Sequence, residues 1–305
     1  MKIERVEAAV GHRTVTNAAV SAFGTITGDY ARMHFDHHAG KDSPIGGTIA
    51  HGLLSACWAM GMLTRYAPQQ LGVGDPAAVI TDLSVRFVRM VYVGDTLCVK
   101  SRPESGGVLT FEVLSQHGEV VTDGRATLSR GQLAPSPKAW KLGAWRALPE
   151  GEICYADDMQ AKGPRGDGRG RTITESDIVR FASEVGETNP LYLNQVFAEA
   201  GRFGARIAPP MLTFCLCFSD FLDALLSMPL PNTGSAGHLG DSWRLHAPVS
   251  IGDTIRGRYC VLSARPSNSQ PAMSVVEFGL QVLNQHDKVV QQGSITMLIA
   301  RRPAA

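Results

Sequence analysis

The sequence predicts an α+β protein made of two tandem copies of one domain, each with a central helix wrapped by an antiparallel sheet. Two observations support this prediction. The chain repeats itself at a constant spacing, and each copy contains one long apolar helical stretch followed by several β-branched runs. A chain of 305 residues, 44% of them hydrophobic, has enough apolar material to fill two cores.

The repeat keeps one register over most of its length. The tetrapeptide RTVT at 13–16 recurs as RTIT at 171–174, and VGDTL at 93–97 recurs as IGDTI at 251–255. Both pairs lie 158 residues apart, and no gap is needed between them. Two copies of this size are too few and too long for a solenoid, so we interpret them as a duplicated domain.

Beyond the second match the spacing changes. Gln116-His117 corresponds to Gln285-His286, which lies 169 rather than 158 residues later, so the second copy carries eleven extra residues. We place them in residues 264–271, which have the composition of a long turn. The expected domains are residues 1–133 and 170–305, and residues 134–169, rich in Pro, Gly and charge, form the expected linker.

The elements follow the same order in both copies. A short helix is expected after a Thr cap, at 16–23 and again at 174–185, and a long apolar helix at 51–63 and again at 210–226. Pro210 suits the first turn of its helix. The β-branched runs that predict strands in the first copy are 78–80, 85–88, 97–99, 109–113 and 120–128.

Charge and composition exclude several classes of protein. The formal net charge is +1 with no long basic run, which disfavours binding to nucleic acid or to a membrane surface. The most apolar stretch, 207–230, is interrupted by Pro209, Pro210, Asp220 and Asp223, so we interpret it as a buried helix. The first residues lack the features of a signal peptide, and the six cysteines form no Cys-x-x-Cys pair. We therefore expect a cytoplasmic protein with reduced, structural cysteines.

The segment that indicates chemistry has two parts. GDYARMHFD at 28–36 places Asp29 five positions before His34, and IAHG at 49–52 forms a turn that opens the long helix. Together with the downstream segment 87–96, these residues resemble the MaoC-like, (R)-specific enoyl-CoA hydratase family of hotdog-fold proteins. The resemblance covers both copies, and it implies a double hotdog.

The resemblance also implies a reaction and a site. It implies a lyase of fatty acyl metabolism that adds water to a trans-2-enoyl thioester or removes it from a 3-hydroxyacyl thioester. Asp29 and His34 would transfer the protons, and the Gly52 N–H would bind the thioester oxygen. The residues that would line the pocket are Ile49, Ala50, His51 and Ser55. No metal, nicotinamide or flavin cofactor is implied, and the expected partner is acyl-CoA or an acyl-carrier-protein thioester, with a homodimer of two such chains as an open alternative.

The physical reasoning agrees with these roles. Hydration of an unsaturated thioester needs a base for water, an acid for the α-carbon and a donor for the developing enolate oxygen. A helix N-terminus with free N–H groups is suited to hold that oxygen, and a glycine there allows close approach.

The second copy differs at the decisive positions: Asp29, His34 and His51-Gly52 correspond to Glu187, Tyr192 and Pro209-Pro210. Tyrosine, with an ordinary pKa of about 10, is a poor base at neutral pH, and Pro210 has no N–H. We therefore expect the chemistry in the first copy. That copy itself departs from the family in having Ala31-Arg32 where the second copy keeps Asn189-Pro190.

Other polar residues have simpler interpretations. His34, Asp36, His37 and His38 match no standard metal spacing, so we expect a solvated loop. The repeated GDT sequences at 94–96 and 252–254 are expected to form tight turns between strands and to have no functional role. Arg86 is expected to pair with a carboxylate.

Two alternative functions remain open from the sequence. A hotdog thioesterase could use the same cleft with an activated water. A non-catalytic subunit that binds acyl thioesters would explain the Ala31-Arg32 departure.

Overall fold

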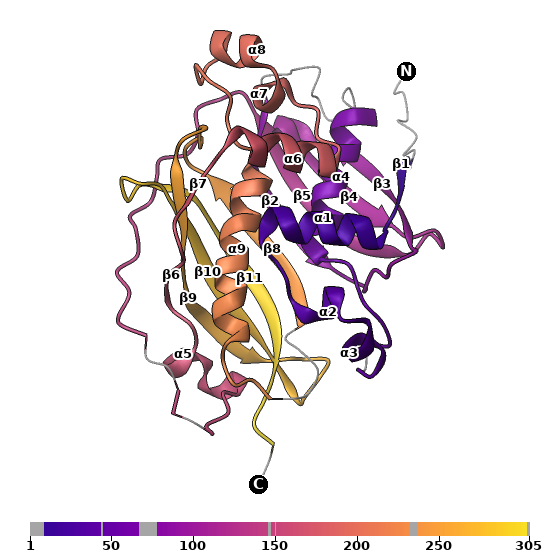
Figure 1. The fold of residues 1–305 in the computed structure, drawn as a ribbon, viewed down its shortest axis with the longest axis vertical. Coiled ribbons are helices and arrows are strands. Elements are labelled where there is room, and N and C mark those ends of the chain that lie inside the picture. The colour runs from indigo at the N-terminus through magenta and orange to yellow at the C-terminus, as the bar shows by residue number, and fades with distance from the viewer. Residues whose placement is uncertain are drawn as a thin grey trace. The chain divides into compact units, whose positions relative to one another are not determined.

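The structure is a computed structural model, and it describes residues 9–43, 45–66, 78–145, 148–149, 151–231 and 237–303. The chain divides into two compact units. Unit 1 contains the residues up to Ile26, Tyr30–Gly131 and Ser176–Arg206. Unit 2 contains Thr27–Asp29, Gln132–Glu175 and Ile207–Ala305. Each unit combines helices with an antiparallel sheet, which confirms the predicted α+β class (Figure 1).

Unit 1 is built on five antiparallel strands in the order β1-β3-β4-β5-β2. Their bounds are β1 Val10–Thr14, β2 Val79–Phe87, β3 Thr96–Pro103, β4 Val108–Leu114 and β5 Val120–Ser129. The central helix α4, Gly52–Tyr66, packs against β1, β3, β4 and β5. Its apolar side chains, among them Leu54, Trp58 and Leu63, are at most 1% exposed. Burial of these residues is the main driving force for wrapping the sheet around the helix.

Among its described residues, unit 1 also contains short helices outside the sheet: α1 Asn17–Thr27, α2 Arg32–Phe35, α3 His37–Lys41, α7 Pro190–Leu193 and α8 Gln195–Ala200. Most of α6, Glu175–Val185, belongs to unit 1 as well. The backbone of α6 lies close to α4, because a Cβ added at Gly61 would meet the carbonyl oxygen of Val185. Arg13 contacts both elements: it donates to Glu184 of α6 at 3.1 Å and lies over the ring of Trp58 of α4.

Unit 2 repeats the plan with longer strands. The order is β8-β11-β10-β9-β6, with β7 also pairing with β9. The bounds are β6 Gly166–Asp167, β7 Arg171–Thr172, β8 Gly237–Leu245, β9 Thr254–Pro266, β10 Met273–Leu283 and β11 Val289–Ala300. The helix α9, Pro210–Leu226, begins and ends where the sequence predicts and packs against β9 and β10.

The repeat extends to individual hydrogen bonds. The Thr14 and Thr96 hydroxyls lie 2.8 Å apart, and so do those of their counterparts Thr172 and Thr254. Asp95 accepts the Tyr92 N–H at 2.8 Å, and Asp253 accepts the Ser250 N–H at the same distance. The GDT turns therefore have the structural role expected of them.

The structure corrects several expected boundaries. The runs 78–80 and 85–88 belong to one strand, β2, which has a register shift between Ile80 and Asp82. The residues 264–266 extend β9 instead of forming a turn, so the extra residues of the second copy lengthen the β9–β10 hairpin. The packing units also do not follow chain order. The domain limits at 133 and 170, which follow the repeat, therefore stay a prediction.

The expected linker packs on the sheet of unit 2. It carries a 3-10 turn η2 (Ala156–Asp158), the short helix α5 (Met159–Lys162) and β6, which pairs with β9. Asp167 of β6 accepts two hydrogen bonds from the Arg258 guanidinium at 2.6 and 2.7 Å. Hydrogen bonds from Arg258 and Arg256 hold the pKa of the Asp167 carboxyl below its usual value.

Five of the six cysteines are buried, and Cys260 is partly exposed. Burial raises the pKa of the Cys154 thiol to about 11 and raises that of Cys217 further. Both residues are therefore protonated at neutral pH and have the unreactive, structural character that was expected. Within the described residues, no helix is both long and apolar enough to span a membrane.

Candidate active site

His34 is held in one tautomer by a backbone carbonyl. It lies on the short helix α2 and is 8% exposed, and its Nδ1 is 2.8 Å from the Ile49 carbonyl oxygen. A carbonyl oxygen can only accept, so Nδ1 carries the proton when the ring is neutral. In that tautomer the other ring nitrogen, Nε2, carries the lone pair, and it is the atom that can accept a proton or a hydrogen bond.

Asp29 lies on the same segment, five residues earlier. It follows Gly28, whose φ of +88° is in the left-handed region that favours glycine. The Asp29 side chain is buried, with 7% exposure, and its backbone N–H points at the Thr27 hydroxyl at 3.4 Å. Within unit 1, a ring nitrogen of His34 lies within 4.8 Å of a ring nitrogen of His51.

His51 is a second titratable side chain beside His34 in unit 1. Its ring centroid is 3.8 Å from that of His34, with 32° between the planes, and it is 2% exposed. Phe23 and Phe35 flank it, with ring centroids 5.2 and 5.8 Å away. The sequence analysis placed His51 only among pocket residues. The IAHG motif could have indicated its direct contact with His34, because both lie next to the same turn.

The turn that carries His51 is fixed by backbone hydrogen bonds. Ile49 N–H donates to the Met33 carbonyl at 3.2 Å, and Ala50 N–H donates to the Val91 carbonyl at 2.8 Å. Ile49 also forms an isolated antiparallel bridge with Tyr92. These bonds join the turn to α2 and to the segment before β3, so the position of His34 and the start of α4 are set together.

Gly52 is the first residue of α4, as the motif predicts. The first N–H groups of a helix have no partner within the helix, and they favour negative charge. The structure adds a second reason for glycine: a Cβ at this position would lie 3.0 Å from the Phe87 ring. Phe87 therefore lies close to the helix start; it is the first residue of the 87–96 segment that contributed to the family resemblance, although its contact with Gly52 was not predicted.

Ser55 is bonded inward. Its hydroxyl donates to the Gly52 carbonyl at 2.7 Å and lies 2.7 Å from the Thr122 hydroxyl of β5, and the residue is 2% exposed. It therefore fastens the first turn of α4 to the sheet. This arrangement favours a packing role for Ser55 over a pocket role.

The other polar residues of the segment have local structural roles. Asp36 caps α3 by accepting the Ala39 N–H at 2.9 Å and pairs with Arg32, and these contacts lower its pKa. His37 Nδ1 lies 3.0 Å from the Thr48 hydroxyl. Arg86 forms two bonds to Asp123, at 2.8 and 2.7 Å, which confirms the expected carboxylate pairing.

The corresponding residues of the second copy are built into the core of unit 1. Glu187 Oε1 accepts the N–H groups of Thr188 and Asn189, both at 2.9 Å, and burial raises the pKa of its carboxyl. Asn189 caps α7 and donates from Nδ2 to the Ala78 carbonyl at 2.8 Å. Tyr192 is 1% exposed, and burial together with the nearby Glu187 charge raises its pKa well above the usual value.

Comparison with known protein families gives a consistent result over both copies. The family model described as MaoC like domain matches residues 2–122, and the model described as FAS1-like, dehydratase domain region matches residues 160–292. An (R)-specific enoyl-CoA hydratase of Rhodospirillum rubrum is 31% identical over 132 residues, which are 43% of this chain and 83% of the relative. A 3-hydroxybutyryl-CoA dehydratase of Methylorubrum extorquens is 26% identical over 164 residues, 52% of this chain and 92% of the relative.

Solved structures resemble the whole chain. A protein described as a MaoC domain protein dehydratase from Chloroflexus aurantiacus matches with a TM-score of 0.74 at 18% identity and covers 98% of this chain and 96% of its own. A conserved Mycobacterium tuberculosis protein described as having a double hotdog fold matches with a TM-score of 0.67 at 16% identity, covering 96% of each chain. At these identities the likeness concerns the fold, and it confirms the predicted double hotdog.

Proposed function

We propose that this chain, which belongs to the MaoC-like family of hydratases and dehydratases, interconverts a trans-2-enoyl thioester and a 3-hydroxyacyl thioester. The observation that carries the proposal is the fixed tautomer of His34. Its Nδ1 is bound to the Ile49 carbonyl, so Nε2 is the basic nitrogen of the ring. His34 is buried, and Ile49 lies just before the start of α4. This combination supplies a base and a donor for an oxyanion within one local structure.

In the hydration direction, the oxygen of water forms a bond to C3 while Asp29 and His34 accept its proton. The C2–C3 π electrons move toward the carbonyl, and the thioester oxygen becomes an enolate that the Gly52 N–H stabilises. The Asp29–His34 pair then returns a proton to C2, so H and OH have been added across the double bond and the pair ends as it began. Dehydration is the reverse, as microscopic reversibility requires.

The substrate class is supported by the names of the relatives, both of which are named for reactions of CoA thioesters. We propose acyl-CoA as the substrate, with a carrier-protein thioester as the alternative delivery. We also propose that the two homologous domains extend over 1–133 and 170–305, which is consistent with family-model matches that begin at residues 2 and 160.

The test is hydration of a panel of trans-2-enoyl-CoA thioesters, followed by the loss of ultraviolet absorbance, with the product resolved on a chiral column. The expected product is the (R)-3-hydroxyacyl-CoA, and its formation should disappear in Asp29→Asn. Release of free CoA thiol in place of hydration would overturn the proposal in favour of a thioesterase. Tight binding of every thioester without turnover would favour a binding subunit.

A further inference from the structure

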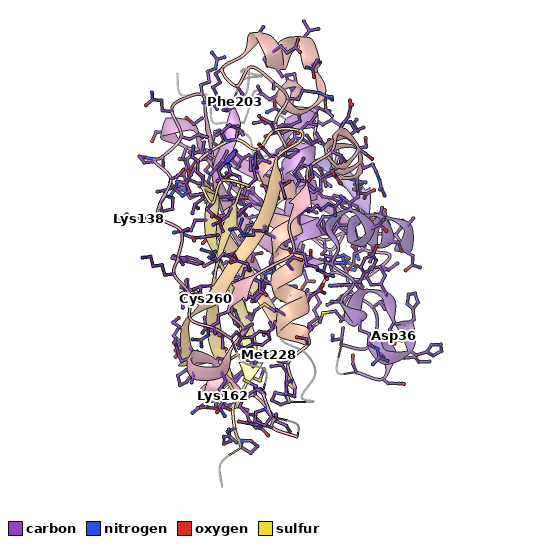
Figure 2. All side chains as sticks on the ribbon, turned by 60° about the vertical axis from the view of Figure 1, so that its left-hand side comes forward. Asp36, Lys138, Lys162, Phe203, Met228 and Cys260 are labelled. Atoms are coloured by element: carbon purple, nitrogen blue, oxygen red, sulfur yellow. The ribbon has the colours of Figure 1, made fainter. Side chains whose placement is uncertain are left out.

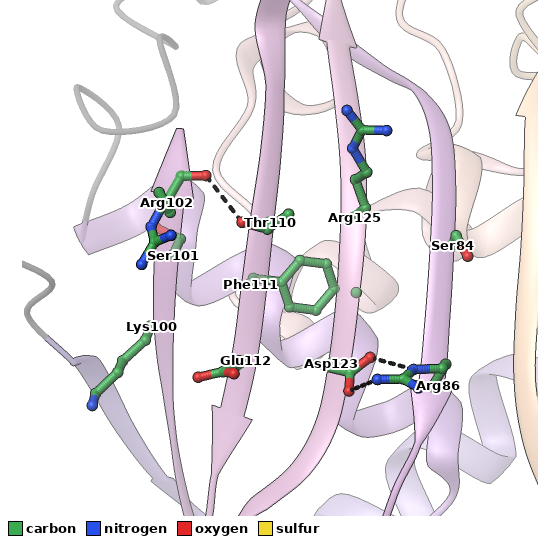
Figure 3. Close-up of a pocket in the computed structure, with 11 residues that line it drawn as sticks. Ser84, Arg86, Lys100, Ser101, Arg102, Thr110, Phe111, Glu112, Asp123 and Arg125 are labelled. Carbon is green, nitrogen blue, oxygen red and sulfur yellow. Dashed lines mark hydrogen bonds and ion pairs between the residues drawn. The ribbon is translucent and has the colours of Figure 1, made fainter. Parts of the chain in front are cut away.

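Four polar side chains form a row across the outer face of the sheet in unit 1. Strand register places Lys100 opposite Glu112, Glu112 opposite Asp123, and Asp123 opposite Arg86, on the neighbouring strands β3, β4, β5 and β2 (Figure 3). They alternate along the strands with core residues such as Leu109 and Val113, and so they lie on the face away from α4. The row lies in a hollow of about 480 Å³ that Arg102 and Arg125 also line.

The hollow is open to solvent and carries more positive than negative charge. The Arg86 side chain is 76% exposed although it pairs with Asp123, and Arg125 is 60% exposed although it bonds to Glu104 at 2.9 Å. With Lys100 and Arg102, four cationic side chains line the hollow against the carboxylates of Glu112 and Asp123. An acidic ligand is therefore favoured over a basic one.

Unit 2 contains the homologous row. Register places Arg258 opposite Gln281, Gln281 opposite Gln292, and Gln292 opposite Arg244. These positions are the repeat counterparts of the four residues in unit 1, at spacings of 158 and 169 residues. The cations at the two ends are kept, whereas the two central carboxylates of unit 1 are neutral amides in unit 2.

In unit 2 this row holds an extended segment of the chain itself. The Gln281 amide accepts the Trp140 N–H at 2.9 Å and donates to the Lys138 carbonyl at 3.1 Å. Arg258 donates to the Trp140 carbonyl at 2.8 Å. Gln281 is 0% exposed as a result, and Figure 2 shows Lys138 on the segment that runs along this side of unit 2.

In unit 2, therefore, side chains of this row bind the backbone of an extended peptide segment. In unit 1, Glu112 can accept a backbone N–H as Gln281 does, and Lys100 can donate to a carbonyl as Arg258 does. Glu112 is instead exposed within the described part of unit 1. We propose that the outer sheet face of unit 1 binds an extended, acidic peptide segment of a partner protein.

One difference between the rows restricts the ligand. In unit 2 the indole of Trp140 lies over Gly279, where an added Cβ would be 2.5 Å from the ring. Unit 1 has Thr110 at the corresponding position, opposite Arg102. The threonine side chain occupies the space that the indole uses, so the peptide bound by unit 1 carries a smaller residue there.

The experiment is selection of 12-residue peptides from a random display library on the immobilised full-length protein. The dissociation constants of the enriched peptides are then measured by fluorescence anisotropy. The expected peptides are rich in Asp and Glu. Lys100→Glu should weaken their binding by at least about tenfold, because it places like charges in contact. Glu112→Gln, which copies Gln281, should preserve or strengthen binding.

The matched control is Arg65→Glu, which makes the same charge change at an exposed position of α4 outside the hollow and should leave the dissociation constants unchanged. Thermal melting of each variant checks that Lys100→Glu remains folded. The proposal is overturned if the enriched peptides bind Lys100→Glu as well as they bind the wild type, or if Arg65→Glu weakens them equally. Failure to enrich any acidic peptide above the display background also overturns it. None of these outcomes depends on hydratase activity, so the proposed function is tested separately.

Discussion

The imidazole ring of His34 lies against that of His51, with 3.8 Å between the ring centroids. The Ile49 carbonyl lies at the Nδ1 edge of His34 and the ring of His51 lies at its face, so Nε2 is the nitrogen that can act as a base when the ring is neutral. Two predictions concern this arrangement, a third concerns the start of α4, and a fourth concerns the second copy.

We predict that Asp29→Asn and His34→Ala each lower turnover of an enoyl-CoA substrate by about 10² to 10⁴, the range typical of general acid–base groups. Both residues are buried, so circular dichroism and thermal melting accompany the kinetics to separate loss of chemistry from loss of fold. Normal turnover in either folded variant would show that the reaction uses other groups.

His51 is predicted to be a positioning residue that acts through His34. His51→Phe keeps an aromatic ring against His34, so it should retain more activity than His51→Ala. The midpoint of the pH dependence of kcat/KM in His51→Phe should equal that of the wild type. His51→Ala removes the packing that holds the His34 ring and should lower kcat more than it raises KM. A shifted pH midpoint in His51→Phe would instead indicate that His51 itself exchanges a proton during turnover.

Gly52→Ala is predicted to lower both stability and activity, because its Cβ would lie 3.0 Å from the Phe87 ring and displace the start of α4. Overpacking of this kind costs about 1–3 kcal/mol of unfolding free energy. Phe87→Leu removes the ring and should restore part of the loss when combined with Gly52→Ala. A double-mutant cycle in denaturant measures this coupling. Additive effects of the two changes would contradict the proposed clash.

How far the sequence alone predicts this protein depends on the type of contact. The apolar stretch that begins at Pro210 predicts α9 to the residue. The repeat spacing matches the strand registers that place Lys100 and Arg258 in equivalent rows. Contacts within one motif, such as His34 with the Ile49 carbonyl, are encoded by local spacing. Local spacing does not encode the assignment of residues 176–206 to unit 1. That assignment depends on long-range contacts such as the hydrogen bond from Asn189 to the Ala78 carbonyl, 111 residues away. The IAHG motif places His34 and His51 near the same turn, but periodicity does not specify the tilted arrangement of their two rings.

Glu187, the counterpart of Asp29, is predicted to make stability depend on pH without contributing to turnover. Burial raises the pKa of its carboxyl above the ordinary value of 4.5, although it accepts hydrogen bonds from the Asn189 and Thr188 N–H groups. Between the unfolded and folded pKa values the native state holds a proton that the unfolded chain has released. The free energy of unfolding therefore falls as pH rises through that interval, and the contribution is fully present only below the ordinary value.

Glu187→Gln should remove this slope, because the amide oxygen can still accept the two N–H bonds without ionising. Its melting temperature at pH 7 should equal or exceed that of the wild type, while at pH 4 the advantage should disappear. Glu119→Gln, at a surface carboxylate whose side chain is 53% exposed, is the matched control and should leave the pH profile unchanged. Turnover in Glu187→Gln should match the wild type. A large loss of activity in this variant would mean that the reaction occurs at the second copy, and a melting temperature below that of the wild type at pH 7 would mean that the carboxylate is bound as the ion.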